Sequence, residues 1–101
     1  MIRHEIILRI PPEINREIIE STMQEVCQLL DGIPGVERVR YGVNHAAAYR
    51  HAMLAVDVVD ERALHRFSLH PWHARAARLI APLAESSAVG SYLISSERRR
   101  S

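Results

Sequence analysis

Hydrophobic residues recur along the chain with two spacings: every second residue in some stretches, and every third or fourth in others. Because neighbouring side chains of a strand point to opposite faces, the first spacing predicts strands over 2–10, 36–43, 49–59 and 88–94. The second spacing predicts helices over 13–31 and 71–83, with a short helix between them that begins after Asp60. The order βαββαβ predicts an α+β fold of the split βαβ type, in which four antiparallel strands form one sheet and the helices cover one face.

The first long helix has a continuous hydrophobic side. Pro11 and Pro12 end the preceding strand and open the helix, and Gly32 is suited to end it. The residues predicted to face the core are Ile14, Ile18, Ile19, Thr22, Met23, Val26, Cys27 and Leu30. This helix should therefore pack along its length on the sheet.

The strand predicted over 49–59 is hydrophobic on both faces, unlike the polar edge strand predicted over 36–43. Helices that cover one face of the sheet leave the other face without a cover. A second copy of the chain is the simplest cover, so we expect a homodimer through this sheet face, with Val56 and Val58 in its dry interface.

The sequence His70-Pro71-Trp72-His73 is the most distinctive local feature. Pro71 lacks an N–H and has a φ near the helical value, so it predicts a helix start with His70 as the cap. The hydrophobic side of this helix is predicted to contain Trp72, Ala76, Leu79, Ile80 and Leu83. His73 lies in the first turn, where the helix dipole disfavours a protonated imidazole, so it is the candidate catalytic base.

Length and charge limit the classes of function. A chain of 101 residues forms one domain, expected over 1–96, with 97–101 as a disordered basic tail. All 13 basic residues are arginine and the net charge is +1, so we expect no nucleic-acid partner and no Schiff-base chemistry. No hydrophobic stretch is long enough to span a membrane, so no membrane partner is expected. The single cysteine, Cys27, cannot form an internal disulfide and fits the reducing cytoplasm.

Several segments together resemble a known family. They are Met1-Ile2-Arg3-His4, Gly32-Ile33-Pro34-Gly35-Val36, Tyr49-Arg50-His51-Ala52, and Leu69-His70-Pro71-Trp72-His73 followed by Ala81-Pro82-Leu83. In this order they resemble the stress-responsive A/B barrel family, also called Dabb, across nearly the whole chain. The resemblance implies a ferredoxin-like monomer that pairs face to face into a homodimeric α+β barrel. It does not fix a reaction, because one fold supports many activities.

The resemblance also implies site residues, through a cyclase of the family that performs an intramolecular aldol condensation. Its catalytic base matches His73, and two further pocket histidines match His4 and His51. A tyrosine that partners the base matches Phe67, and a second pocket tyrosine matches Val26, so this chain lacks both hydroxyl groups. Their loss removes hydrogen bonds that would orient a substrate oxygen.

The sequence thus predicts a pocket between helices and sheet that holds a small hydrophobic organic molecule. Besides His73, the residues expected to line it are His4, His51, His70, Phe67, Trp72, Met23, Val26 and Met53. No cofactor is expected, and no metal site, because His70 lies outside the helix while His4 and His51 lie toward opposite ends of the sheet.

Two functions fit this pocket. In the first, the protein is a proton-transfer lyase or cyclase that uses His73 as its base. In the alternative, it is a non-catalytic stress-protective or structural assembly domain, whose histidines only support the fold. A cavity that reaches His73 favours the first, whereas a side chain sealed by packing favours the second.

Overall fold

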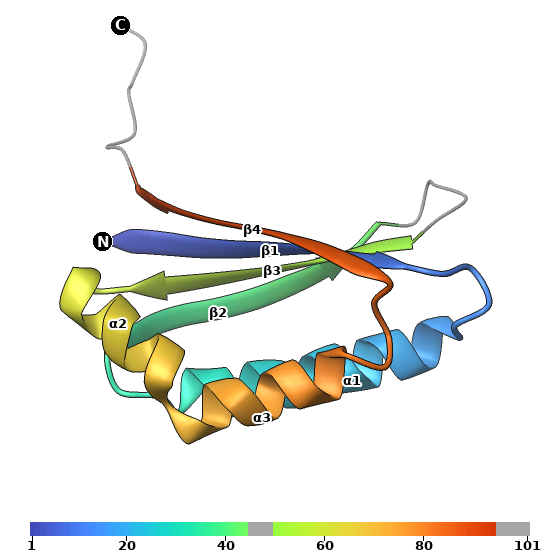
Figure 1. Cartoon of the computed structure of the whole chain (residues 1–101), viewed down its shortest axis with the longest axis horizontal. Coiled ribbons are helices and arrows are strands. Elements are labelled where there is room, and N and C mark those ends of the chain that lie inside the picture. The colour runs from blue at the N-terminus through green and yellow to red at the C-terminus, as the bar shows by residue number, and fades with distance from the viewer. Residues whose placement is uncertain (45–49, 95–101) are drawn as a thin grey trace, which may run out of the picture.

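The computed structural model describes residues 1–44 and 50–94, whose arrangement is shown in Figure 1. In chain order the elements are β1 (Ile2–Ile10), α1 (Arg16–Asp31), β2 (Val36–Val43), β3 (Arg50–Val58), α2 (Glu61–Leu69), α3 (Pro71–Ile80) and β4 (Ser86–Leu93). The predicted βαββαβ order is confirmed, with α2 and α3 together forming the second helical segment. The predicted strand start at residue 49 and the predicted tail over 97–101 lie outside the described residues.

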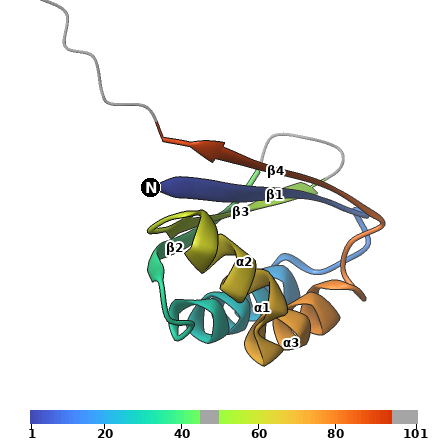
Figure 2. The same cartoon turned by 60° about the vertical axis from the view of Figure 1, so that its left-hand side comes forward.

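The four strands form one sheet in the order β2-β3-β1-β4, and all three neighbouring pairs are antiparallel. The helices lie together on one face of this sheet, and the other face is open (Figure 2). This is the ferredoxin-like α+β arrangement that the sequence predicts. β2 lies at one edge, so the prediction of an edge strand over 36–43 is also confirmed.

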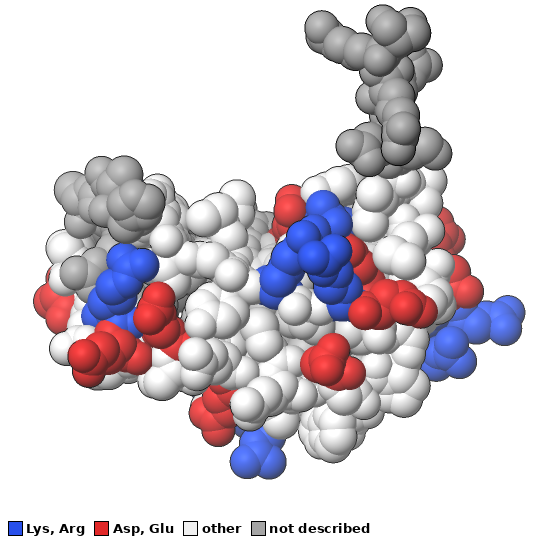
Figure 3. Space-filling model, turned by 180° about the vertical axis from the view of Figure 1, so that it is seen from behind, with Lys and Arg blue, Asp and Glu red and all other residues white. Residues whose placement is uncertain are grey.

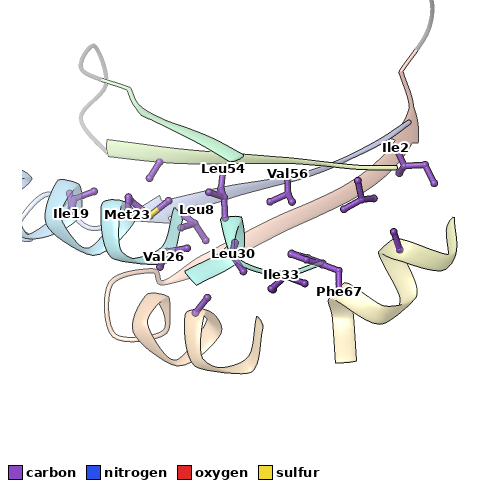
Figure 4. Close-up of a cluster of buried hydrophobic side chains, with 14 of the residues drawn as sticks. Ile2, Leu8, Ile19, Met23, Val26, Leu30, Ile33, Leu54, Val56 and Phe67 are labelled. Carbon is purple, nitrogen blue, oxygen red and sulfur yellow. The ribbon is translucent and has the colours of Figure 1, made fainter. Parts of the chain in front are cut away.

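The hydrophobic core lies between the inner face of the sheet and the helices (Figure 4). α1 contributes four residues at three- and four-residue steps, each at most 2% exposed: Ile19, Met23, Val26 and Leu30. The strands contribute Ile2, Leu8, Ile10, Ala52, Leu54, Val56 and Val58. Phe67 of α2 points into the same layer, so the core fixes the position of α2 against the sheet.

α1 begins at Arg16 rather than at the predicted residue 13, because Asn15 acts as its N-cap. The Glu17 N–H donates to the Asn15 side-chain oxygen at 2.7 Å, which satisfies an amide at the helix start. The predicted burial of Ile18 is wrong, since this residue is 52% exposed. Ile18 lies about 100° around the helix from the buried Ile19, and this rotation takes it away from the sheet.

Val56 and Val58 do not lie on the open face, so their predicted place in a dimer interface is wrong. Both are fully buried beneath the helices. The alternation predicted for this strand holds, but the more hydrophobic of its two faces is the one that the helices cover. The β3 residues on the open face are His51, Met53, Ala55 and Asp57.

The open face combines a paired charge with exposed hydrophobic side chains. The Arg3 guanidinium donates to both carboxylate oxygens of Asp57, at 2.8 and 3.0 Å. This ion pair holds the pKa of Asp57 below its ordinary value. On the same face, Ile7 and Met53 are 46% and 41% exposed. The ion pair neutralises two of the charges on this face, and the exposed hydrophobic side chains beside it are suited to packing on another protein surface.

The surface seen from behind carries charged side chains of both signs in small groups (Figure 3). A basic group on this side has acidic side chains next to it, so no extended basic region is visible there. Within residues 1–44 and 50–94, no helix is long and hydrophobic enough to cross a membrane.

Candidate functional site

The junction of α2 and α3 is positioned by two local caps. Asp60 accepts from the Ala63 N–H at 2.8 Å and starts α2. His70 ends α2 and starts α3, and its Nδ1 atom accepts from the Trp72 N–H at 3.0 Å. The predicted helix start at Pro71 is therefore confirmed. These caps place His73 in the first turn of α3, next to the sheet.

Three aromatic rings meet between the helices and the sheet, and we call them the histidine cluster: His4, Phe67 and His73. The Phe67 ring is edge-on to both imidazoles, with centroid distances of 5.9 Å to His4 and 5.0 Å to His73. The three residues belong to β1, α2 and α3 in that order, so the fold assembles the cluster from distant parts of the chain. His4 Nδ1 also lies 2.6 Å from the Ser91 Oγ on β4.

Both histidines of the cluster favour the neutral form. Burial lowers the pKa of His73. Burial, and secondarily the positive charge that His73 can carry, lowers the pKa of His4. A neutral imidazole has one nitrogen with a free lone pair, so at neutral pH His73 can accept a proton or a hydrogen bond.

A cavity of about 440 Å³ adjoins His73 and lies between α3 and the strands β1 and β4. Its walls are mainly hydrophobic and include Ile6, Leu8, Leu30, Leu54, Phe67, Ile80 and Val89. Alanines of α3 and of the segment after it leave the space open: Ala76, Ala77, Ala81 and Ala84. A hydrophobic cavity with a few polar groups is the usual form of a small-molecule site. We refer to this space as the first cavity.

The structure brings only part of the predicted site together. His4, Phe67 and His73 meet as described, and Phe67 and His73 line the first cavity. His51 and Met53 lie on the open face of the sheet and do not line the first cavity. This separation follows from strand alternation, because His4 is on the inner face while His51 is opposite Arg9 on the outer one.

Four other predicted residues have structural roles. Met23 and Val26 are fully buried in the core and are not part of the cavity wall. His70 is the helix cap. Trp72 is 42% exposed and its ring lies against Gly32 at the end of α1, so its predicted place on the buried side of α3 is wrong.

The sequence reasoning missed Ser91, which is the hydrogen-bonding neighbour of His4. The signal for it was present. Alternation in β4 places Ser91 and Val89 on the inner face, and the register pairs Ser91 with His4. Such a pair cannot be identified before the order of the strands is known.

The side chains that could hold a metal ion remain apart. Among the residues that the structure describes, no three His, Cys, Asp or Glu side chains lie close enough together for such a site. Cys27 is half-buried in α1, and burial raises the pKa of its thiol. The thiol is therefore a poor nucleophile at neutral pH.

Acidification should destabilise the protein through the histidine cluster. In the unfolded chain both imidazoles titrate near their ordinary pKa of about 6.5, whereas in the fold both pKa values are lower. Between these values the unfolded state binds more protons, so the free energy of unfolding falls as the pH drops below about 6.5. Urea denaturation at pH 7.5, 6.5 and 5.5 measures this change.

Two variants show whether the cluster causes this pH dependence. His73→Gln should reduce the loss of stability between pH 7.5 and 5.5, while the exposed His65→Gln should leave it unchanged. Equal pH dependence in the wild type and His73→Gln would show that His73 does not titrate with a lowered pKa.

Comparison with known proteins identifies the sequence family. The model of the stress responsive A/B barrel domain, Dabb, matches residues 2–92. No curated protein matches the sequence.

Solved structures agree with the fold. A dimeric ferredoxin-like protein of unknown function from Thermobifida fusca is 22% identical, with a TM-score of 0.75 over 92% of this chain and 90% of that chain. A protein from Arabidopsis thaliana is 16% identical, with a TM-score of 0.82 over 98% of this chain and 100% of the other. The hydroxynitrile lyase from Passiflora edulis is 17% identical, with a TM-score of 0.75 over 97% and 96% of the two chains. At these identities the similarity establishes the fold alone.

Proposed function

The chain belongs to the stress-responsive A/B barrel (Dabb) family, and from this premise we propose that it binds a small hydrophobic organic molecule beside His73 and transfers a proton through that residue. The observation that carries the proposal is the first cavity, about 440 Å³ in volume, whose hydrophobic walls adjoin His73. The lowered pKa of His73 supports its role as a base, because it keeps the imidazole neutral at physiological pH. That a hydroxynitrile lyase has the same fold supports lyase or cyclase chemistry for this architecture.

The chemistry follows from the surroundings of His73. Hydrophobic walls bind the carbon skeleton of a ligand and keep water away from the imidazole. A ligand C–H or O–H that points at the neutral nitrogen donates its proton there. A C–H bond next to a carbonyl group is among the C–H bonds that a general base can break, because the carbonyl oxygen takes up the negative charge of the enolate; we therefore propose a carbonyl compound as the substrate class.

A second function is ligand binding without a reaction, as in a stress-protective or assembly domain. Phe67 favours it, because its ring lies between the two histidines and carries no hydroxyl group for a substrate oxygen. The two functions share the first cavity and differ in whether His73 removes a proton.

We also propose that the protein is a homodimer, with the open sheet face covered by a second copy. The exposed Ile7 and Met53 and the Arg3–Asp57 pair on this face support the assembly. The dimeric ferredoxin-like protein from Thermobifida fusca supports it as well. We also propose a cytoplasmic location, which fits a chain whose single cysteine, Cys27, cannot form an internal disulfide.

Two matched probes test the binding site. 1-Naphthol has a hydrophobic body and an O–H that can donate to His73, whereas naphthalene has the same body and no donor. His73→Ala should weaken the binding of 1-naphthol by about 1–3 kcal/mol, or roughly 5- to 150-fold in Kd, because a buried hydrogen bond is lost. The binding of naphthalene should change little. Fluorescence titration of both probes measures the two affinities.

His65→Ala is the control, since this histidine is exposed and does not line the first cavity. It should leave both affinities unchanged. If His73→Ala lowers the melting temperature but alters neither affinity, His73 is a packing residue and the proposed binding site is wrong.

A further inference from the structure

A second cavity, about 640 Å³ in volume, lies between α2 and the strands β1 and β4. Hydrophobic side chains contribute to its walls from all three elements: Ile2, Leu64 and Leu93. His4 and Ser91 also line it, so their hydrogen-bonded pair is accessible from this side. His4 therefore adjoins the second cavity, as His73 adjoins the first.

The two cavities follow one another along the same pair of strands. The β1–β4 register pairs Ile6 with Val89 and His4 with Ser91, and these are consecutive inward-facing pairs. The Ile6–Val89 pair lines the first cavity, and the His4–Ser91 pair lines the second. Phe67 contacts both imidazoles at this boundary. The polar groups thus lie beside the step from the first cavity to the second along β1 and β4.

Within residues 1–44 and 50–94, no segment covers the inner face of β4. All eight residues of β4 are exposed. Val89 and Leu93 are 60% and 73% exposed, although they lie on the face of the sheet that carries the helices. Each belongs to one cavity: Val89 to the first and Leu93 to the second. Covering both residues would bury hydrophobic surface that is now open to water.

We infer that the ligand is an extended chain that lies along the inner face of β4, with one carbonyl group at the histidine cluster and a hydrophobic arm in each cavity. This inference rests on the proposed function and adds the shape of the ligand to it. One hydrophobic arm packs against Val89 and the other against Leu93. The carbonyl group lies beside the polar His4–Ser91 pair between them. The four-residue step from Val89 to Leu93 spans about 13 Å, the length of an extended chain of roughly eleven carbons.

Two isomeric ketones test this shape. 6-Undecanone has its carbonyl group in the middle of the chain, and 2-undecanone has it near one end. The wild-type protein should bind 6-undecanone more tightly, as measured by displacement of 1-naphthol fluorescence. Val89→Ser and Leu93→Ser should each raise the Kd for 6-undecanone by about fivefold or more, because each removes the hydrophobic contact of one arm of the ligand. Both side chains are exposed, so the variants should fold.

Ala88→Ser is the matched control, because it lies on the same strand but on the open face of the sheet. It should leave the affinity for 6-undecanone unchanged. If Val89→Ser weakens the binding of 6-undecanone and Leu93→Ser does not, the ligand occupies the first cavity alone. The extended shape of the ligand is then wrong, while the proposed function stands. Equal affinity of the two ketones would also overturn the extended shape. If His73→Ala leaves the affinity for 1-naphthol unchanged, the proposed function itself is wrong.

Discussion

Val56→Asp should unfold the protein or lower its free energy of unfolding by more than about 4 kcal/mol, the largest effect that we expect from a single substitution. Val56 is fully buried on the inner face of β3, paired with His4 on one side and Val39 on the other. A carboxylate there would lose its hydration. The neighbouring His4 favours its neutral form, so the carboxylate would have no cationic partner, and burying an unpaired charge is strongly unfavourable. Circular dichroism and urea denaturation measure the loss.

Met53→Asp is the matched control on the same strand. Met53 lies on the open face and is 41% exposed, so the new carboxylate stays in contact with water in the monomer. We expect the fold to be retained and the proposed dimer to be weakened, because the charge enters the interface. Sedimentation equilibrium at micromolar concentration measures the association. An unchanged dimer would show that this sheet face is not the interface, and a folded Val56→Asp protein would show that the two faces of β3 are assigned wrongly.

His73→Ala should lower proton transfer to and from a bound ketone by about 10²- to 10⁴-fold, the usual contribution of a general base. In the proposed reaction, neutral His73 takes a proton from the carbon next to the carbonyl group, and the C–H electrons move into the enolate. The imidazolium then exchanges its N–H proton for a deuteron from D₂O. Transfer of that deuteron back to the enolate carbon regenerates the ketone with deuterium at this position. Incubation of 6-undecanone with the protein in D₂O, followed by NMR, measures the rate of deuterium incorporation.

This experiment separates the two proposed functions. If the wild-type protein binds 6-undecanone but does not accelerate exchange above the buffer rate, the protein binds ligands without proton transfer. Ala88→Ser should exchange at the wild-type rate, since Ala88 lies on the open face of the sheet and lines neither cavity. An equally fast His73→Ala protein would show that another group is the base.

The expected acid sensitivity and the proposed proton transfer depend on the same property of the histidine cluster. Burial that lowers the pKa of His73 also keeps its nitrogen free to accept a proton at neutral pH. The exchange rate should therefore decrease as His73 becomes protonated, in the same pH range in which the protein loses stability. This link follows from the position of His73 at the edge of a hydrophobic cavity rather than from the helix dipole alone.

Local sequence patterns were sufficient to predict the order of the elements and the local structure around His73. Strand alternation and helical spacing predicted the βαββαβ order, because these periods follow from backbone geometry. The starts of α2 and α3 were equally predictable, since Asp60, His70 and Pro71 act on residues within one helical turn. The position of His73 in that first turn followed directly.

Tertiary structure decided which face of each strand is covered and which distant residues meet. Alternation divides β3 into two sets of residues, but it does not say which set the helices cover, and so Val56 and Met53 were assigned to the wrong surroundings. His4 and His51 matched the resemblance equally well, yet only His4 reaches Phe67. Ser91 joined the site through the pairing of β1 with β4. Burial and strand pairing depend on contacts between residues far apart in the sequence, and local patterns alone do not fix them.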